Sequence, residues 1–153
     1  MISDLYILEF GFWNLDLKTI CFGDFGLKVD IEVQTMNEQQ MKTRTKEFAK
    51  SIIRLCRLLP GNREGRLIGN QIFRSGTSIA ANYRAACRAR STADFISKLA
   101  IVEEEADETL FWLEIIKEMK ILDDAFIDSL MKENDEIIAI IVSSIKTARK
   151  KKK

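Results

Sequence analysis

The segment from Ser51 to Gly65 reads S-I-I-R-L-C-R-L-L-P-G-N-R-E-G and contains the only proline of the 153-residue chain. Apolar residues recur at helical spacing up to Leu59, where Pro60-Gly61-Asn62 breaks the pattern. Runs rich in Ala, Leu, Ile, Glu, Lys and Arg extend far on both sides, and these residues favour helix. The sequence therefore predicts an all-α fold with a tight turn at this break.

Four helices are predicted on either side of this turn, over about 37–59, 63–90, 91–120 and 123–149. Asn37 with Gln40, and Ser91 with Asp94, are typical helix starts. Ser75-Gly76-Thr77-Ser78 predicts a kink in the second helix. Long helices joined by short turns favour an antiparallel up-down four-helix bundle. In the second helix a stripe of small residues would let another helix approach closely, at Gly65, Gly69, Gly76, Ala80 and Cys87.

Residues 1–35 differ from the rest of the chain. They hold six aromatic residues and three glycines without sustained helical spacing, and Val29–Val33 alternates as a short strand does. We expect an N-terminal extension over 1–35, with Met36 as the natural start, a bundle over 36–149 and a basic tail over 150–153. The alternative is an aromatic arm that docks on the bundle.

The composition removes most catalytic and metal chemistry. The chain has no histidine, which excludes Ser-His-Asp and Cys-His catalysis, His-ligated zinc and the Glu-x-x-His di-iron site. Cys21, Cys56 and Cys87 are far apart, and we expect reduced thiols in a cytoplasmic protein. The N-terminus lacks the basic region of a signal peptide, and Ile137–Ile145 is too short to span a bilayer. We expect a non-enzymatic protein without a cofactor or metal.

Charge is strongly segregated, although the formal net charge is only +1. Residues 42–98 hold 13 Lys and Arg against three acids, and residues 99–140 hold three Lys against 13 acids. Unrolled at 100° per residue, the first two helices carry basic faces opposite their apolar faces. These faces are the candidate nucleic-acid-binding residues: Lys46, Lys50, Arg54, Arg57, Arg63, Arg66, Arg74, Arg84 and Arg88.

The third and fourth helices each carry a second apolar stripe that one bundle core does not need. Monomers rarely expose apolar patches beyond a few hundred Å², so the second stripes predict a homo-oligomer. The candidate interface residues are Ile101, Glu105, Trp112, Ile115, Met119, Ile127, Met131, Ile138 and Val142. Within the acidic run 103–108 most residues should be solvated, whereas Glu105 falls among the apolar group and should pair with an arginine.

The run F-R-S-G-T-S-I-A-A-N-Y-R-A-A-C-R-A-R-S from Phe73, continuing T-A-D-F-I-S-K-L-A-I-V-E-E-E-A-D-E-T-L-F-W-L-E, strongly resembles one family. These are the four-helix bundle proteins encoded in bacterial 23S ribosomal RNA intervening sequences, and the likeness extends over about 42–149. The positions that match the family pattern are Arg74, Ser75, Gly76, Asn82, Tyr83, Arg84, Arg88, Glu103, Glu104, Glu105 and Trp112.

The resemblance implies an all-helical protomer that forms a ring-like homo-pentamer, in a family without established catalytic activity. A more distant relative is the accessory variability protein of diversity-generating retroelements. It implies a basic surface able to hold nucleic acid or a protein partner such as a reverse transcriptase.

Two functions fit these observations. The first is an oligomeric accessory protein that binds RNA or DNA, RNA foremost, mainly through phosphate contacts that weaken with salt. The second is a protein-interaction scaffold in which the basic helices of one subunit meet the acidic helices of its neighbour, without nucleic acid. Arg84→Glu separates them, because it should weaken RNA binding in the first case and break the oligomer in the second.

Overall fold

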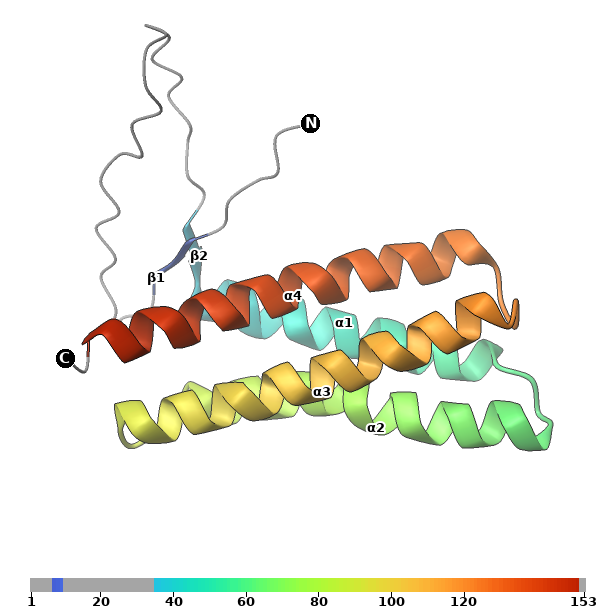
Figure 1. Cartoon of the computed structure of the whole chain (residues 1–153), viewed down its shortest axis with the longest axis horizontal. Coiled ribbons are helices and arrows are strands. Elements are labelled where there is room, and N and C mark those ends of the chain that lie inside the picture. Colours follow the sequence, from blue (N-terminus) through green and yellow to red (C-terminus); the bar gives the residue numbers. More distant parts are fainter. Residues whose placement is uncertain (1–6, 10–34, 152–153) are drawn as a thin grey trace, which may run out of the picture.

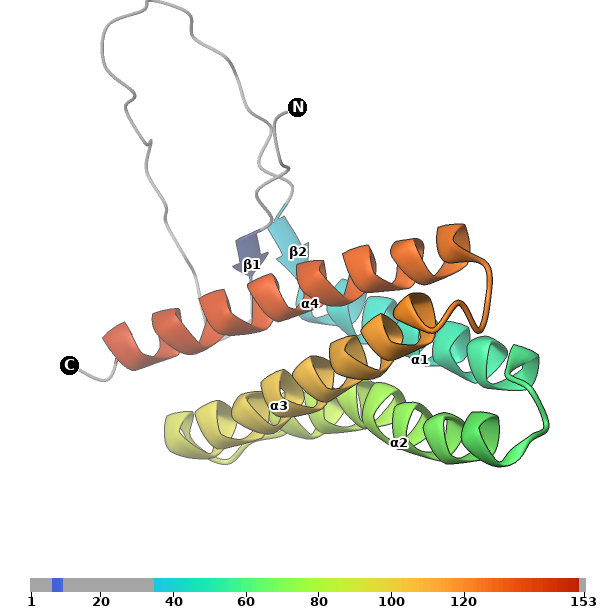
Figure 2. The ribbon, with the colours of Figure 1, turned by 45° about the vertical axis from the view of Figure 1, so that its right-hand side comes forward.

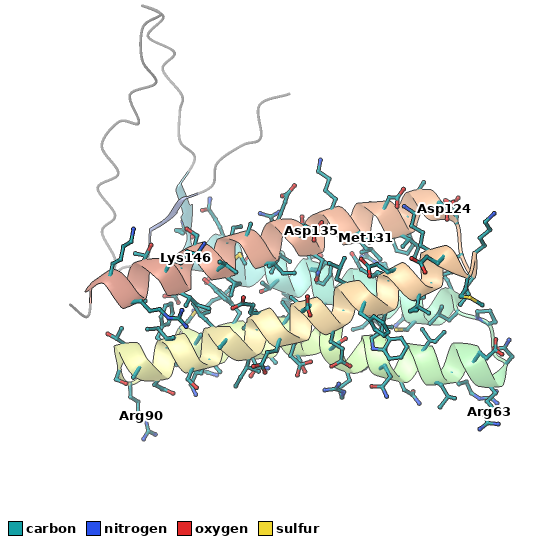
Figure 3. The ribbon with its side chains drawn as sticks, in the orientation of Figure 1. Arg63, Arg90, Asp124, Met131, Asp135 and Lys146 are labelled. Carbon is teal, nitrogen blue, oxygen red and sulfur yellow. The ribbon has the colours of Figure 1, made fainter. Side chains whose placement is uncertain are left out.

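A computed structural model describes residues 7–9 and 35–151, and four helices make up most of this part (Figure 1). The helices are α1 (Glu38–Leu58), α2 (Arg63–Ala86), α3 (Thr92–Glu118) and α4 (Asp124–Lys151). Each helix packs against the next one along the chain, whereas α1 and α4 contact each other sparsely. Arg63 and Asp124 lie at one end of the molecule, and Arg90 and Lys146 lie toward the other (Figure 3). The predicted all-helical fold with four helices is confirmed.

Local capping signals explain where the helices begin. Asn37 and Gln40 form a capping box at the start of α1, and the Asn62 side chain accepts a hydrogen bond from the Gly65 backbone at the start of α2. Ser91 caps α3 by accepting from the Asp94 backbone. Because these contacts are made within four residues, the helix starts were predictable from short sequence patterns.

The second helix ends at Ala86, earlier than the predicted end near position 90. It continues as one helix through the segment 75–78, where a kink was predicted. Ser75 and Thr77 donate their hydroxyl hydrogens to the carbonyls of Gln71 and Phe73, one turn earlier in the same helix. Hydrogen bonds of this kind are compatible with a continuous helix, and they often bend it.

The core consists mainly of aliphatic side chains from all four helices, with a few aromatic ones such as Tyr83 and Phe48. Fully buried examples are Ile52, Ile79, Leu99, Leu113, Ile137 and Ile141. In α3 the buried positions include Thr109, whereas the neighbouring Leu110 is half-buried. Thr109 fits the interior because its hydroxyl donates to the Glu105 carbonyl at 2.7 Å and lies 3.0 Å from Ser75 Oγ of α2.

A short pair of parallel strands precedes the bundle, and the sequence did not predict it. Strand β1 (Ile7–Glu9) pairs with β2 (Thr35–Asn37), with Ile7 opposite Thr35 and Glu9 opposite Asn37. Figures 1 and 2 show β2 leading into α1 and the pair lying beside α4. The predicted strand at Val29–Val33, the six aromatic residues and Cys21 lie outside the described residues. Among the described helices, none combines the length and apolar character needed to cross a membrane.

Candidate nucleic-acid interface

The beginning of α1 and the end of α2 enclose a hollow of about 270 Å³. Its lining, which we call the basic groove, consists of Gln39, Lys42, Thr43, Lys46, Arg84 and Arg88. Four of the six residues are cationic and none is acidic. Lysine and arginine side chains arranged in this way attract anions, and an arginine guanidinium binds a phosphate through two hydrogen bonds.

Helical spacing and the contact between α1 and α2 build this groove. Lys42 and Lys46 are one turn apart on α1, so they project from one face. Arg84 lies in the last turn of α2 and Arg88 in the turn that follows the helix, and both line the hollow. The helices meet where a Cβ on Gly76 would touch Ile52 and where Cys56 Sγ lies 3.6 Å from the Gly69 carbonyl oxygen. These contacts place the first half of α1 beside the second half of α2.

The charges of the basic groove are largely uncompensated. Lys42 forms an ion pair with Glu38 one turn earlier, on the same helix. Within the part of the chain that the structure describes, Lys46, Arg84 and Arg88 form no ion pair. Three cations that face a hollow without a carboxylate partner create a positive potential there.

Most of the remaining predicted basic residues lie exposed on α1 and at the α1–α2 turn. Arg54, Arg57 and Arg63 are exposed, and Lys50 pairs with Glu47 at 2.7 Å on the surface. Arg66 donates a hydrogen bond to the Gly61 carbonyl in the turn. Lys42 was missing from the prediction. The spacing of Gln39, Lys42, Thr43 and Lys46, at i, i+3, i+4 and i+7, was the available sign that they share a face.

Arg74 does not belong with the other basic residues. Its Nη2 lies 2.6 Å and 2.7 Å from the two carboxylate oxygens of Glu108, and its Nη1 lies 3.7 Å from Glu105 Oε1. Glu108 raises the pKa of the Arg74 guanidinium above its usual value. Arg74 therefore links α2 to α3, and the predicted arginine row is corrected to exclude it.

Glu105 has the arginine partner that its apolar surroundings led us to expect. Arg74 approaches one of its oxygens, but Oε2 is buried and has no hydrogen-bond partner within the described part of the chain. Burial raises the pKa of the Glu105 carboxyl, and the charge of Arg74 opposes this effect. One half of this carboxylate is therefore left without a donor in the single chain.

The predicted interface residues of α3 line a surface shared with α2. Ile101 and Met119 are exposed, at 39% and 66%, and Trp112 and Ile115 are half-buried. Trp112 Nε1 lies 3.4 Å from Glu108 Oε1, which ties this surface to the Arg74 ion pair. Two exposed residues missing from the prediction belong to the same helices, Leu67 and Phe111. We call the whole set the α2–α3 apolar surface: Leu67, Ile101, Phe111, Trp112, Ile115 and Met119.

The predicted interface residues of α4 lie elsewhere. Met131, Ile138 and Val142 are half-buried near the side of α4 that contacts α3, where Asn134 donates to the Ala106 carbonyl at 2.9 Å. Ile127 is fully buried in the core of the single chain, so its place in the predicted interface is corrected. The second stripes of α3 and α4 therefore do not form one continuous surface.

The described residues show no site for a metal. Within the ranges 7–9 and 35–151 no three His, Cys, Asp or Glu side chains are grouped so as to hold an ion. Cys56 and Cys87 are free thiols, and burial raises the pKa of both. A raised pKa keeps these thiols protonated and weakly nucleophilic.

Comparison with known proteins agrees with the fold described above. The model of one family, described as 23S rRNA-intervening sequence protein, matches residues 37–143. The chain is also similar to a crystal structure, at 1.70 Å resolution, of a protein with unknown function from the S23 ribosomal protein family of Bacteroides thetaiotaomicron. The two are 39% identical with a TM-score of 0.66, over 69% of this chain and 98% of that one. No curated protein matches the chain.

Proposed function

Because this chain belongs to the family of 23S rRNA-intervening sequence proteins, we propose that it is a non-enzymatic accessory protein that binds nucleic acid, RNA foremost. The similar protein of known structure is itself of unknown function, so the proposal depends on the site rather than on that likeness. The observation that carries it is the basic groove, where Lys42, Lys46, Arg84 and Arg88 converge without an acidic residue in the lining.

Phosphate groups are the chemistry that suits this groove. Lys42 and Lys46 are separated by one helical turn, about 6 Å along the axis. Arg84 and Arg88 line the same hollow from the end of α2 and the turn after it. The two pairs together supply donors to successive phosphates of one strand. Contacts of this kind carry no base information, so binding should be weakly sequence-specific and should weaken steeply with salt.

The test compares two arginines of the groove with a third arginine, which lies on α2 outside the groove. Arg84→Gln/Arg88→Gln removes two groove cations, and Arg74→Gln removes a cation that faces α3. RNA binding by the full chain is titrated over a range of salt, with the mass of the complex measured in parallel. We expect the groove variant to lose about tenfold or more in affinity and to lower the salt slope by about two contacts, with Arg74→Gln close to wild type.

Equal losses in the two variants would show that overall charge, rather than the groove, attracts the RNA. Absence of binding by the wild-type protein at low salt would contradict the proposed function itself.

A second candidate function is the protein-interaction scaffold. The observation in its favour is a set of exposed acids on α3, Glu104, Asp107, Glu114 and Glu118, which form no ion pair within the described residues. In this arrangement the antiparallel up-down bundle would be one protomer of a cytoplasmic homo-oligomer, a pentamer by the family resemblance. The basic groove of each subunit would then meet α3 of its neighbour. Arg84→Glu that dissociates the oligomer would support the scaffold, and an intact oligomer that no longer binds RNA would exclude it.

A further inference from the structure

An exposed aromatic ring interrupts the cationic face of α2. Phe73 is 46% exposed, although phenylalanine is usually buried. Arg66, Phe73, Thr77 and Arg84 are spaced by 7, 4 and 7 residues, so they fall within about 40° of one another around α2. Arg88 follows in the turn just after the helix. We call this set the Arg66–Arg88 column. Its helical part, from Arg66 to Arg84, spans about 27 Å along the axis, at 1.5 Å per residue.

Two contacts between α1 and α2 show where Phe73 lies along the axis of α2. The Cys56–Gly69 contact lies about one turn before Phe73 along α2, and the Gly76–Ile52 contact lies about one turn after it. Half-buried Ile53 and exposed Arg54 of α1 lie between Ile52 and Cys56, and so between the same two contacts. Phe73 therefore stands between Arg66 at the turn and the basic groove that contains Arg84 and Arg88.

The surroundings of Phe73 differ from those of the other exposed phenylalanine. Phe111 meets Trp112 edge to face, with ring centroids 5.0 Å apart, and belongs to the α2–α3 apolar surface. Phe73 has no aromatic partner among the described residues, and its own helix face carries arginines on both sides. A ring placed among cations suits a partner that is anionic and also offers a flat apolar face.

Nucleic acid with unpaired bases has both properties. Its phosphates bind to the arginines, and an unstacked base covers the ring, which strengthens binding without regard to sequence. A duplex offers the same phosphates, but its bases are already stacked on one another. Accepting the nucleic-acid-binding function above, we propose that the Arg66–Arg88 column holds a single strand and that Phe73 stacks on one of its bases.

The experiment uses the full chain and an RNA of about 12 nucleotides, a length within the range of known single-strand sites. The RNA is offered as a single strand and annealed to its complement. Phe73→Leu keeps an apolar side chain without a ring, Phe73→Trp keeps a ring, and Phe111→Leu is the matched control. Thermal unfolding of each variant shows whether the fold is retained.

We expect the wild type to prefer the single strand. Phe73→Leu should lose about tenfold in affinity for the single strand and little for the duplex, with an unchanged salt slope because no phosphate contact is lost. Phe73→Trp and Phe111→Leu should bind like the wild type.

Equal binding of single strand and duplex, or a folded Phe73→Leu with full affinity, would overturn the stacking proposal. If Arg84→Gln/Arg88→Gln still weakened binding, the proposed function would stand, whereas a wild type that binds neither RNA would contradict both.

Discussion

At Gly76 the contact between α1 and α2 leaves no room for a side chain. A Cβ there would lie 2.7 Å and 2.9 Å from Cγ1 and Cγ2 of Ile52, which is buried and β-branched. We predict that Gly76→Ala lowers the free energy of unfolding by about 1–3 kcal/mol, because the overpacking outweighs the better helix propensity of alanine. Urea unfolding measures the change.

Gly61→Ala is the control, since a Cβ at Gly61 would meet nothing within 4 Å. That variant should equal the wild type or gain about 0.4–1 kcal/mol from a less flexible unfolded chain. Equal stability of Gly76→Ala and wild type would mean that the two helices are further apart than described. The small-residue stripe was visible in the sequence, but the side chain that fills the space above Gly76 was not.

One ion-pair cluster joins the first and last helices, α1 and α4. Arg44 Nε donates to Glu133 Oε1 at 2.6 Å and its Nη2 donates to Glu133 Oε2 at 2.8 Å, while Glu136 is also paired with Nη2. These carboxylates raise the pKa of the Arg44 guanidinium above its usual value. Since α1 and α4 contact each other sparsely, this cluster contributes much of what connects them.

We predict that Arg44→Ala lowers the free energy of unfolding by about 1–2 kcal/mol, less than for a buried pair because Glu133 and Glu136 are partly solvated. The variant also leaves two carboxylates three residues apart on α4 without their cation. Urea unfolding at low salt and at 1 M salt should show the loss shrinking as the charges are screened.

Arg54→Ala, at an exposed site without an ion pair, should have no effect. A similar loss in both variants would mean that the ion pairs of Arg44 contribute nothing specific to stability.

The bounds of the helices were more predictable than the neighbours of each helix face. Caps such as Asn37 and Ser91 act on backbone groups within one turn, so short patterns reveal them. Arg74 and Arg84 both lie outside the core of α2, but α3 flanks one edge of that helix and α1 the other. A helical wheel does not contain this information, which is why the predicted arginine row included both. Ile127 was misplaced for the same reason, because packing against α3 widens the buried arc of α4.

The α2–α3 apolar surface is the feature of the whole molecule that a single chain leaves unexplained. Its residues Ile101, Phe111 and Met119 are exposed. The same helix, α3, carries Glu105, whose Oε2 is buried without a donor among the described residues. A second copy of the chain would cover the apolar side chains and could bring a donor to this oxygen. The homo-oligomer proposed above therefore has a definite surface to test.

We predict that the wild-type protein is an oligomer and that Ile101→Glu/Met119→Glu is a monomer, because two carboxylates would have to be desolvated in the interface. Light scattering after size-exclusion chromatography measures the mass. Leu58→Glu is the control, since Leu58 is 59% exposed but belongs to α1, which contributes no residue to this surface. An oligomer that survives the double substitution and dissociates with Leu58→Glu would move the interface to the end of α1. A monomeric double variant that still binds RNA would show instead that assembly and nucleic-acid binding use different faces of α2, the two faces on which Arg74 and Arg84 lie.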